Sequence, residues 1–136
     1  MNMPAMAIAQ GCGFVARGFT GDREQLIEIL VTAVRHQGFS FVEVIQPCIT
    51  WKTHPLKWYK ERVEKLDDNY DTGDRAVALS KLMNPGEKIL TGIFHQRGGG
   101  SVFGHSYRKS VTQGPLAELK PVGLNIIGQL LEKFRL

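Results

Sequence analysis

The sequence predicts an α/β protein with a mainly parallel sheet flanked by helices. The first observation is a strand, a helix and a second strand between Phe14 and Ile45, the order and length of a parallel βαβ unit. The second is the nearly unbroken apolar run Phe39–Thr50, typical of a strand buried on both faces. The third is a length of 136 residues, 43% of them hydrophobic, which suits one small domain with its own core.

Glycines and prolines delimit the first elements. A short helix is predicted over Pro4–Gln10, because proline suits a first helical turn and a glycine follows the last residue. A short strand follows over about Phe14–Arg17, between glycines that mark bends. The GCG segment lacks both the dinucleotide fingerprint and the P-loop pattern. We therefore interpret it as a tight turn around a small buried Cys12.

The clearest helix is predicted over Gly21–Gln37. Its cap is either Asp22, which could form a capping box with Gln25, or Thr20. Gly38 supplies the stop at its carboxyl end. Apolar residues at helical spacing form one stripe along it: Leu26, Ile29, Leu30, Ala33 and Val34.

The next strand, predicted over about Ser40–Ile45, leads directly to Pro47 and Cys48. Its one charged residue is Glu43, for which we favour a neighbouring donor or the sheet rim over a catalytic role. Proline cannot continue a strand ladder, so Cys48 follows the end of a strand. Ligands and chemistry collect there in open α/β sheets. Position alone leaves two interpretations open, a small buried core residue or a functional thiol.

The rest of the chain predicts three helices and one or two strands. In Leu56–Asp67, Tyr59, Val63 and Leu66 share one helical face. We expect residues 1–136 to form a single domain, with 101–136 as a peripheral tail that ends in a helix. The predicted segments are a helix over Leu56–Asp67, a helix over Arg75–Met83 stopped by Asn84-Pro85-Gly86, a strand over Lys88–His95, a possible strand over Ser101–Phe103, and an amphipathic helix over Leu124–Leu136.

Composition argues against several classes of function. The net charge of +4 is a mild bias, and the aromatic, basic segment Lys52–Arg62 is followed at once by acidic residues, so we expect no nucleic-acid binding. No apolar run reaches the roughly 18 residues that a membrane span needs, and the amino terminus lacks a basic leader, so we expect a cytoplasmic protein. Four histidines show no metal-binding spacing and are assigned to the surface by default. Neither cysteine belongs to a CxxC, so this chain alone has no complete zinc or cluster site.

Two segments together resemble a known enzyme family. One reads GFVARGFTGDREQLIEILVTAVRHQGFSFVEVIQPCITW and the other reads WYKERVEKLDDNYDTGDRAVA. The combination resembles the carboxyl-terminal half of the β subunit of 2-oxoacid:ferredoxin oxidoreductases, over roughly residues 3–95. The last 40 residues match less clearly.

The resemblance implies a partial thiamine-diphosphate-binding-type fold and a place in an electron-transfer complex. Such enzymes oxidatively decarboxylate a 2-oxoacid to an acyl-CoA on thiamine diphosphate, and they pass electrons through an iron–sulfur cluster to ferredoxin. The cysteine of the QPC segment ligates a [4Fe–4S] cluster in this family, which by that match makes Cys48 one of the four ligands. The implied partners are the amino-terminal half of the β subunit, the α subunit and ferredoxin.

The chain also departs from the family pattern. It lacks the half that would supply three further cysteines and the GDG segment and asparagine for Mg²⁺ and diphosphate, so alone it should be inactive and should bind neither thiamine diphosphate nor a complete cluster. Where the family often has Thr-Phe-Asn, this chain has Thr50-Trp51-Lys52. The alternative is a stand-alone interaction module that retains the fold without catalysis.

Overall fold

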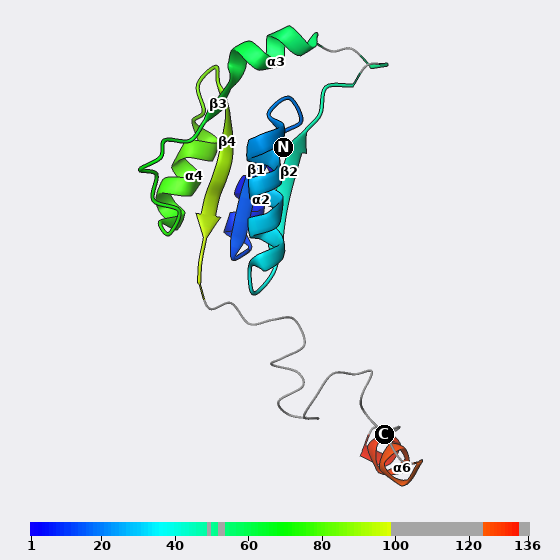
Figure 1. Cartoon of the computed structure of the whole chain (residues 1–136). Helices are drawn as coiled ribbons and strands as arrows, with labels where there is room; N and C mark the ends of the chain where they lie inside the picture. Colours follow the sequence, from blue (N-terminus) through cyan, green and yellow to red (C-terminus); the bar gives the residue numbers. More distant parts are fainter. Residues whose placement is uncertain (49, 52–53, 99–123, 134–136) are drawn as a thin grey trace. The chain divides into compact units, whose positions relative to one another are not determined.

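The first part of the chain folds around a four-stranded mixed sheet. The computed structural model describes residues 1–48, 50–51, 54–98 and 124–133. Contacts divide the chain into two units, Met1–Phe103 and Gly104–Leu136. In the first unit the strand order is β2-β1-β4-β3 (Figure 1). The strands are β1 (Phe14–Phe19), β2 (Ser40–Ile45), β3 (Val63–Lys65) and β4 (Ile89–Gln96). The two outer pairs are parallel and the central β1–β4 pair is antiparallel, so the predicted α/β class is confirmed.

The predicted βαβ unit is present. Strand β1 is followed by α2 (Arg23–Arg35) and then by β2, which pairs with β1 in parallel from Phe14↔Ser40 to Phe19↔Ile45. Asp22 caps the helix by accepting a hydrogen bond from the Gln25 amide at 3.1 Å. Of the two caps predicted, Asp22 is therefore the one that is present. The cap starts the helix directly after β1, so the chain crosses over to β2 without a long loop.

Helices cover both faces of the sheet. On one face α2 packs Ile29 against Phe14 and Ala16 of β1, with Ala33 beside them. On the other face lie α1 (Met3–Ala9) and α4 (Arg75–Met83), which pack Ile8 and Leu82 with strand residues. Because successive strand residues point to opposite faces, Val15 and Phe94 belong to this second core. Cys12 is buried in it, as predicted, and its thiol donates to the Phe14 carbonyl at 3.1 Å.

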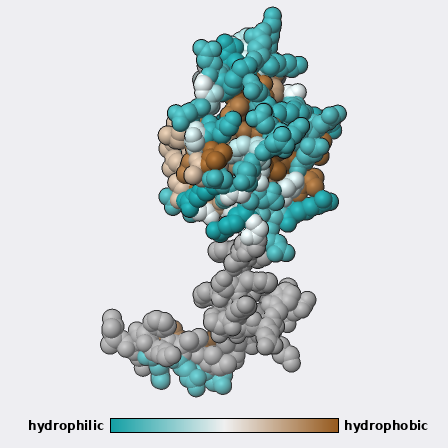
Figure 2. All heavy atoms as spheres, turned by 90° about the vertical axis from the view of Figure 1, so that its left-hand side faces the viewer, coloured by the Kyte–Doolittle hydropathy of each residue, from teal (hydrophilic) through white to brown (hydrophobic). Residues whose placement is uncertain are grey.

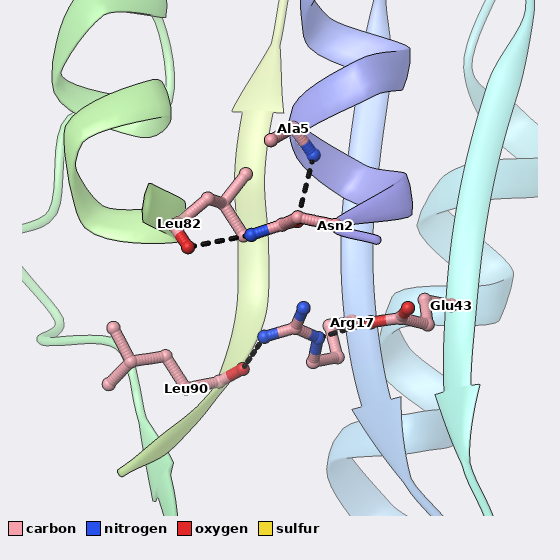
Figure 3. Close-up of polar contacts among 6 residues, drawn as sticks. All are labelled: Asn2, Ala5, Arg17, Glu43, Leu82 and Leu90. Carbon is pink, nitrogen blue, oxygen red and sulfur yellow. Dashed lines mark hydrogen bonds and ion pairs between the residues drawn. The ribbon is translucent and has the colours of Figure 1, made fainter. Parts of the chain in front are cut away.

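Arg17 connects three strands across the middle of the sheet. Its guanidinium forms an ion pair with Glu43, the residue directly opposite on β2 (Figure 3). It also donates to the Leu90 carbonyl of β4 at 3.4 Å and lies 5.7 Å from the centre of the Phe94 ring. Glu43 therefore has the partner donor that we favoured. Asn2 forms a second tie between elements, because it caps α1 through the Ala5 amide and donates to the Leu82 carbonyl of α4.

A bulge in β4 is held by the loop that precedes α4. The register between β1 and β4 shifts at Phe94, so this residue has no direct opposite on β1. The Tyr70 hydroxyl donates to the Phe94 carbonyl at 2.9 Å, which satisfies a group that the bulge removes from the ladder. His95 is buried, and its Nδ1 lies 3.0 Å from the Thr72 carbonyl. The default surface assignment is therefore wrong for His95.

The helix predicted over Leu56–Asp67 is too long. Helix α3 covers Leu56–Arg62, and Val63–Lys65 forms strand β3 beside β4. The Leu66 amide extends this ladder by donating to the Thr91 carbonyl at 2.8 Å. Tyr59, Val63 and Leu66 share a helical spacing, but pairing with β4 overrides it, since a three-residue segment takes the structure that its neighbours offer.

The burial predicted for Phe39–Thr50 is also wrong. Strand β2 lies at the edge of the sheet, and its residues are half-buried or exposed. Within the described part of the chain, no strand pairs with its outer side. The apolar stripe predicted along α2 is only partly buried. Ile29 is buried and Leu26 is half-buried, while Leu30 and Val34 are exposed.

The second unit contributes one described element, α6 (Leu124–Lys133). Ile127 and Leu131, two members of its apolar stripe, are exposed. The possible strand at Ser101–Phe103 lies outside the described residues. No helix in the described ranges is both long and apolar enough to cross a membrane. The expected division into one domain with a peripheral tail stays a prediction.

Replacing Arg17 should destabilise the sheet. We expect Arg17→Met to lower the free energy of unfolding by roughly 1.5–3 kcal/mol, because it leaves the Glu43 carboxylate without its charged partner in a partly buried position. Urea denaturation measures this change. Arg35→Met on the exposed end of α2 is the matched control and should change stability by less than about 0.5 kcal/mol. Equal effects of the two substitutions would contradict a central role for Arg17.

Candidate functional site at the carboxyl ends of the parallel strands

The carboxyl ends of β1 and β2 meet at one end of the sheet. The Thr20 amide donates to the Ile45 carbonyl at 3.0 Å, and the Thr20 hydroxyl approaches the same oxygen at 3.3 Å. Beyond Ile45 the chain leaves the ladder, and Pro47 and Cys48 follow. Helix α3 lies beyond this end of the sheet, at the top of Figure 1. Cys48 therefore lies just beyond the carboxyl end of β2, as the sequence predicted.

A cavity of about 430 Å³ opens beside Cys48. Its walls come from the ends of both parallel strands and from the segment that leads into α3. The described residues that line it are Thr20, Gln46, Pro47, Cys48, His54, Pro55 and Leu56. The lining is mostly apolar with few polar groups, so a group bound there would be partly shielded from water.

Cys48 is an exposed thiol with hydrogen-bond donors at its sulfur. The Trp51 amide lies 3.3 Å from the Cys48 sulfur and donates to it. This hydrogen bond, followed by one from the Thr50 amide, holds the pKa of Cys48 below its usual value. The main donors are backbone groups, so a change of side chain at Trp51 does not remove them. Cys48 is exposed, so its interpretation as a small buried core residue is wrong, while a functional role for the thiol stays a prediction.

A stack of side chains forms the wall next to the cavity. The His54 and Trp58 rings are stacked with centroids 3.9 Å apart, and the Arg62 guanidinium lies 4.4 Å from the Trp58 ring centre. Tyr59 meets Trp58 edge-on and stacks on Phe19 at the end of β1. These contacts attach α3 to the strand ends. Trp58 and Arg62 are four residues apart within α3, a spacing that could have predicted their contact.

The other candidates lie apart from this cavity. Glu43 faces Arg17 inside the sheet, and His95 is buried at the far end of β4. His36 packs against Phe14 at 5.6 Å, with its Nε2 buried and unpartnered. His105 lies outside the described residues. Among the residues that the structure describes, no group of three or more His, Cys, Asp or Glu could hold a metal ion.

The Cys48 environment fits one ligand of an iron–sulfur cluster. Thiolates bind such clusters, and hydrogen bonds to sulfur tune them. The exposed sulfur with its amide donors next to an open cavity meets both requirements. The fold and the site thus define an α/β protein with an exposed cysteine at the carboxyl ends of its parallel strands.

Comparisons with known proteins agree on a family. Residues 48–110 match the family described as the C-terminal part of the pyruvate ferredoxin oxidoreductase beta subunit. The chain is 35% identical over 108 residues to the 2-oxoacid:ferredoxin oxidoreductase subunit beta of Saccharolobus solfataricus, covering 71% of this chain. It is 36% identical over 107 residues to subunit beta of 2-oxoacid:ferredoxin oxidoreductase 2 of Aeropyrum pernix, covering 70%. The resemblance to the carboxyl-terminal part of these β subunits is confirmed.

A solved structure supports the same relationship. The chain superposes with a TM-score of 0.77 and 25% identity on a 2-oxoglutarate:ferredoxin oxidoreductase from Magnetococcus marinus, which has 2-oxoglutarate, coenzyme A and succinyl-CoA bound. The match covers 96% of this chain and 44% of that one. The partial fold predicted from the resemblance is confirmed. The chain spans 35% of the length of each of these curated relatives.

The reactivity of Cys48 should depend on the Trp51 amide. We expect Trp51→Pro, which removes the N–H donor, to raise the Cys48 pKa and to slow its alkylation near pH 7, because less of the thiol is then ionised. The rate of carboxamidomethylation against pH, followed by intact mass, measures the shift. Trp51→Ala keeps the amide and should preserve the profile. The same apparent pKa in both variants would exclude the amide as the cause.

Proposed function

We propose that this chain works as the carboxyl-terminal part of the β subunit of a 2-oxoacid:ferredoxin oxidoreductase. The complete complex would oxidatively decarboxylate a 2-oxoacid to an acyl-CoA and deliver electrons through a [4Fe–4S] cluster to ferredoxin. The carrying observation is Cys48, an exposed thiol with a lowered pKa at the strand ends of a chain similar to these subunits. Its substrate would be a 2-oxoacid.

Within this proposal Cys48 binds one iron of the cluster. The bound cluster would supply one-electron transfer between the site of decarboxylation and ferredoxin. The chain's own part is to hold the sulfur in place. Pairing of β1 with β2 fixes Ile45, Pro47 restricts the backbone after it, and the Trp51 and Thr50 amides stabilise negative charge on the sulfur.

The remaining components would come from other polypeptide segments. We assign the other three cluster cysteines, Mg²⁺ and thiamine diphosphate to the amino-terminal half of the β subunit, with the α subunit and ferredoxin as further partners. This division is supported by the share of the relatives that the chain spans, 35% of their length. The chain alone would then be inactive. We also propose that the complex works in the cytoplasm.

The ligand assignment can be tested on a reconstituted complex. Co-expressed anaerobically with the α subunit and the rest of the β subunit of the Saccharolobus solfataricus relative, the wild-type chain should yield a complex with four irons per cluster. Cys48→Ala should lose the cluster or hold it incompletely, measured by iron and sulfide content and by electron paramagnetic resonance.

Cys12→Ala is the matched control, because Cys12 is the buried cysteine and donates to backbone carbonyls. It should keep the cluster. An intact four-iron cluster with unchanged spectra in Cys48→Ala would refute the assignment. A wild-type complex that assembles without any cluster would instead favour the alternative, an interaction module that retains the fold.

A further inference from the structure

Helix α3 lacks the usual means of attachment to a core. None of its residues, all of which the structure describes, is buried, and no side chain caps its amino end at Pro55. Hydrophilic surface predominates at the end of the first unit where α3 lies (Figure 2). A helix of seven residues is too short to be stable in isolation. The contacts of its aromatic side chains therefore have to account for its position.

A series of aromatic contacts connects α3 to the buried end of β1. Phe19, the last residue of β1, is 2% exposed, and the Tyr59 ring stacks on it with centroids 6.3 Å apart. Tyr59 in turn meets the Trp58 ring edge-on, with centroids 5.0 Å apart. The guanidinium of Arg62, one turn further along α3, lies 4.4 Å from the Trp58 ring centre. The Trp58 ring is therefore held both by the core and by its own helix.

The same series of contacts ends at the cavity beside Cys48. The His54 ring stacks on Trp58 with centroids 3.9 Å apart and an angle of 13° between the two planes. His54 is one of the described residues that line the cavity together with Cys48. Because His54 precedes the first residue of α3, its ring is oriented by this stack and not by the helix. Trp58 thus stands behind a wall of the cavity.

The place of this wall matters for a cluster bound at Cys48. In a [4Fe–4S] cluster with four thiolate ligands, the reduced state carries one more negative charge than the oxidised state. Water stabilises the more highly charged state, so access of water favours reduction and raises the reduction potential. A ring that keeps water away from the cavity therefore lowers the potential of the cluster.

We propose that Trp58 is a positioning residue that holds the His54 ring as a barrier between the cluster at Cys48 and water, and so keeps the reduction potential of that cluster low. This inference rests on the proposed function. The close, nearly parallel stack and the place of His54 in the cavity lining support it. Trp58 acts through His54, and the His54 ring acts as a wall and not as a ligand.

Substitutions of Trp58 test its part in the complex reconstituted with the α subunit and the rest of the β subunit of the Saccharolobus solfataricus relative. Trp58→Leu keeps an apolar side chain and removes the flat ring. We expect it to raise the ratio of reduced to oxidised cluster about tenfold at a fixed solution potential, which is about 59 mV for a one-electron couple. Trp58→Phe restores a flat ring and should stay close to wild type. Potentiometric titration followed by electron paramagnetic resonance measures the shift.

The matched control is Lys57→Gln, at the neighbouring position of α3. The Lys57 side chain is 86% exposed, so its charge is screened by solvent. This variant should keep the wild-type potential. Iron and sulfide content verifies that each complex holds a four-iron cluster before its potential is compared.

A double-variant cycle shows whether Trp58 acts through His54. His54→Ala removes the wall itself and should raise the potential about as much as Trp58→Leu. The double variant should shift no further than His54→Ala alone, because the wall is then already lost. His54→Phe keeps a flat ring without its nitrogens and should preserve the low potential.

The other outcomes each overturn a part of the proposal. Equal potentials in all complexes, or additive shifts in the double variant, exclude Trp58 as a positioning residue. A shift in His54→Phe as large as that in His54→Ala replaces the barrier by a hydrogen bond from the ring. Loss of the cluster from both Trp58→Leu and His54→Ala assigns the stack to cluster assembly instead.

None of these results touches the ligand assignment, which Cys48→Ala decides separately. An intact cluster in Cys48→Ala would overturn that assignment and this inference together.

Discussion

The link between Arg17 and Glu43 is the constraint on which the arrangement of the sheet depends. The two residues lie opposite each other in the parallel β1–β2 register, and Arg17 reaches β4 as well. A slip of one residue would turn every β2 side chain to the other face and separate the charges in a partly buried place. Register at Glu43 also sets how far the chain extends beyond Ile45, so a contact in the middle of the sheet determines where the Cys48 sulfur lies.

Local signals predicted much of the fold. The Asp22 cap, the glycine stops and the proline near Asn84 predicted α2 and α4, and β2 was predicted with its observed bounds, because these features act within a few residues. Strand β3 escaped prediction because it depends on β4 more than 20 residues away. The antiparallel central pair and the Phe94 bulge were likewise set by distant partners such as Tyr70.

The candidate site divides in a similar way. Its position followed from sequence, because an apolar strand and Pro47 place Cys48 beyond the strand end, and the family resemblance supplied a role for the thiol. The electrostatic character of the site did not follow from the sequence. The pKa of Cys48 is lowered by hydrogen bonds from backbone amides, and no residue type specifies where those amides point. The stack of His54 on Trp58 also needed the fold, as it forms where the chain enters α3 from a loop.

The unprotected β2 edge has a consequence for the life of the polypeptide in the cell. An apolar edge strand beside an exposed helix stripe is the type of surface that chaperones and proteases recognise on orphan subunits. Without a neighbour on that edge, such a strand is a template for pairing with other copies of the chain. Coverage of this edge, as well as the free energy of unfolding, would then govern how much of the protein accumulates.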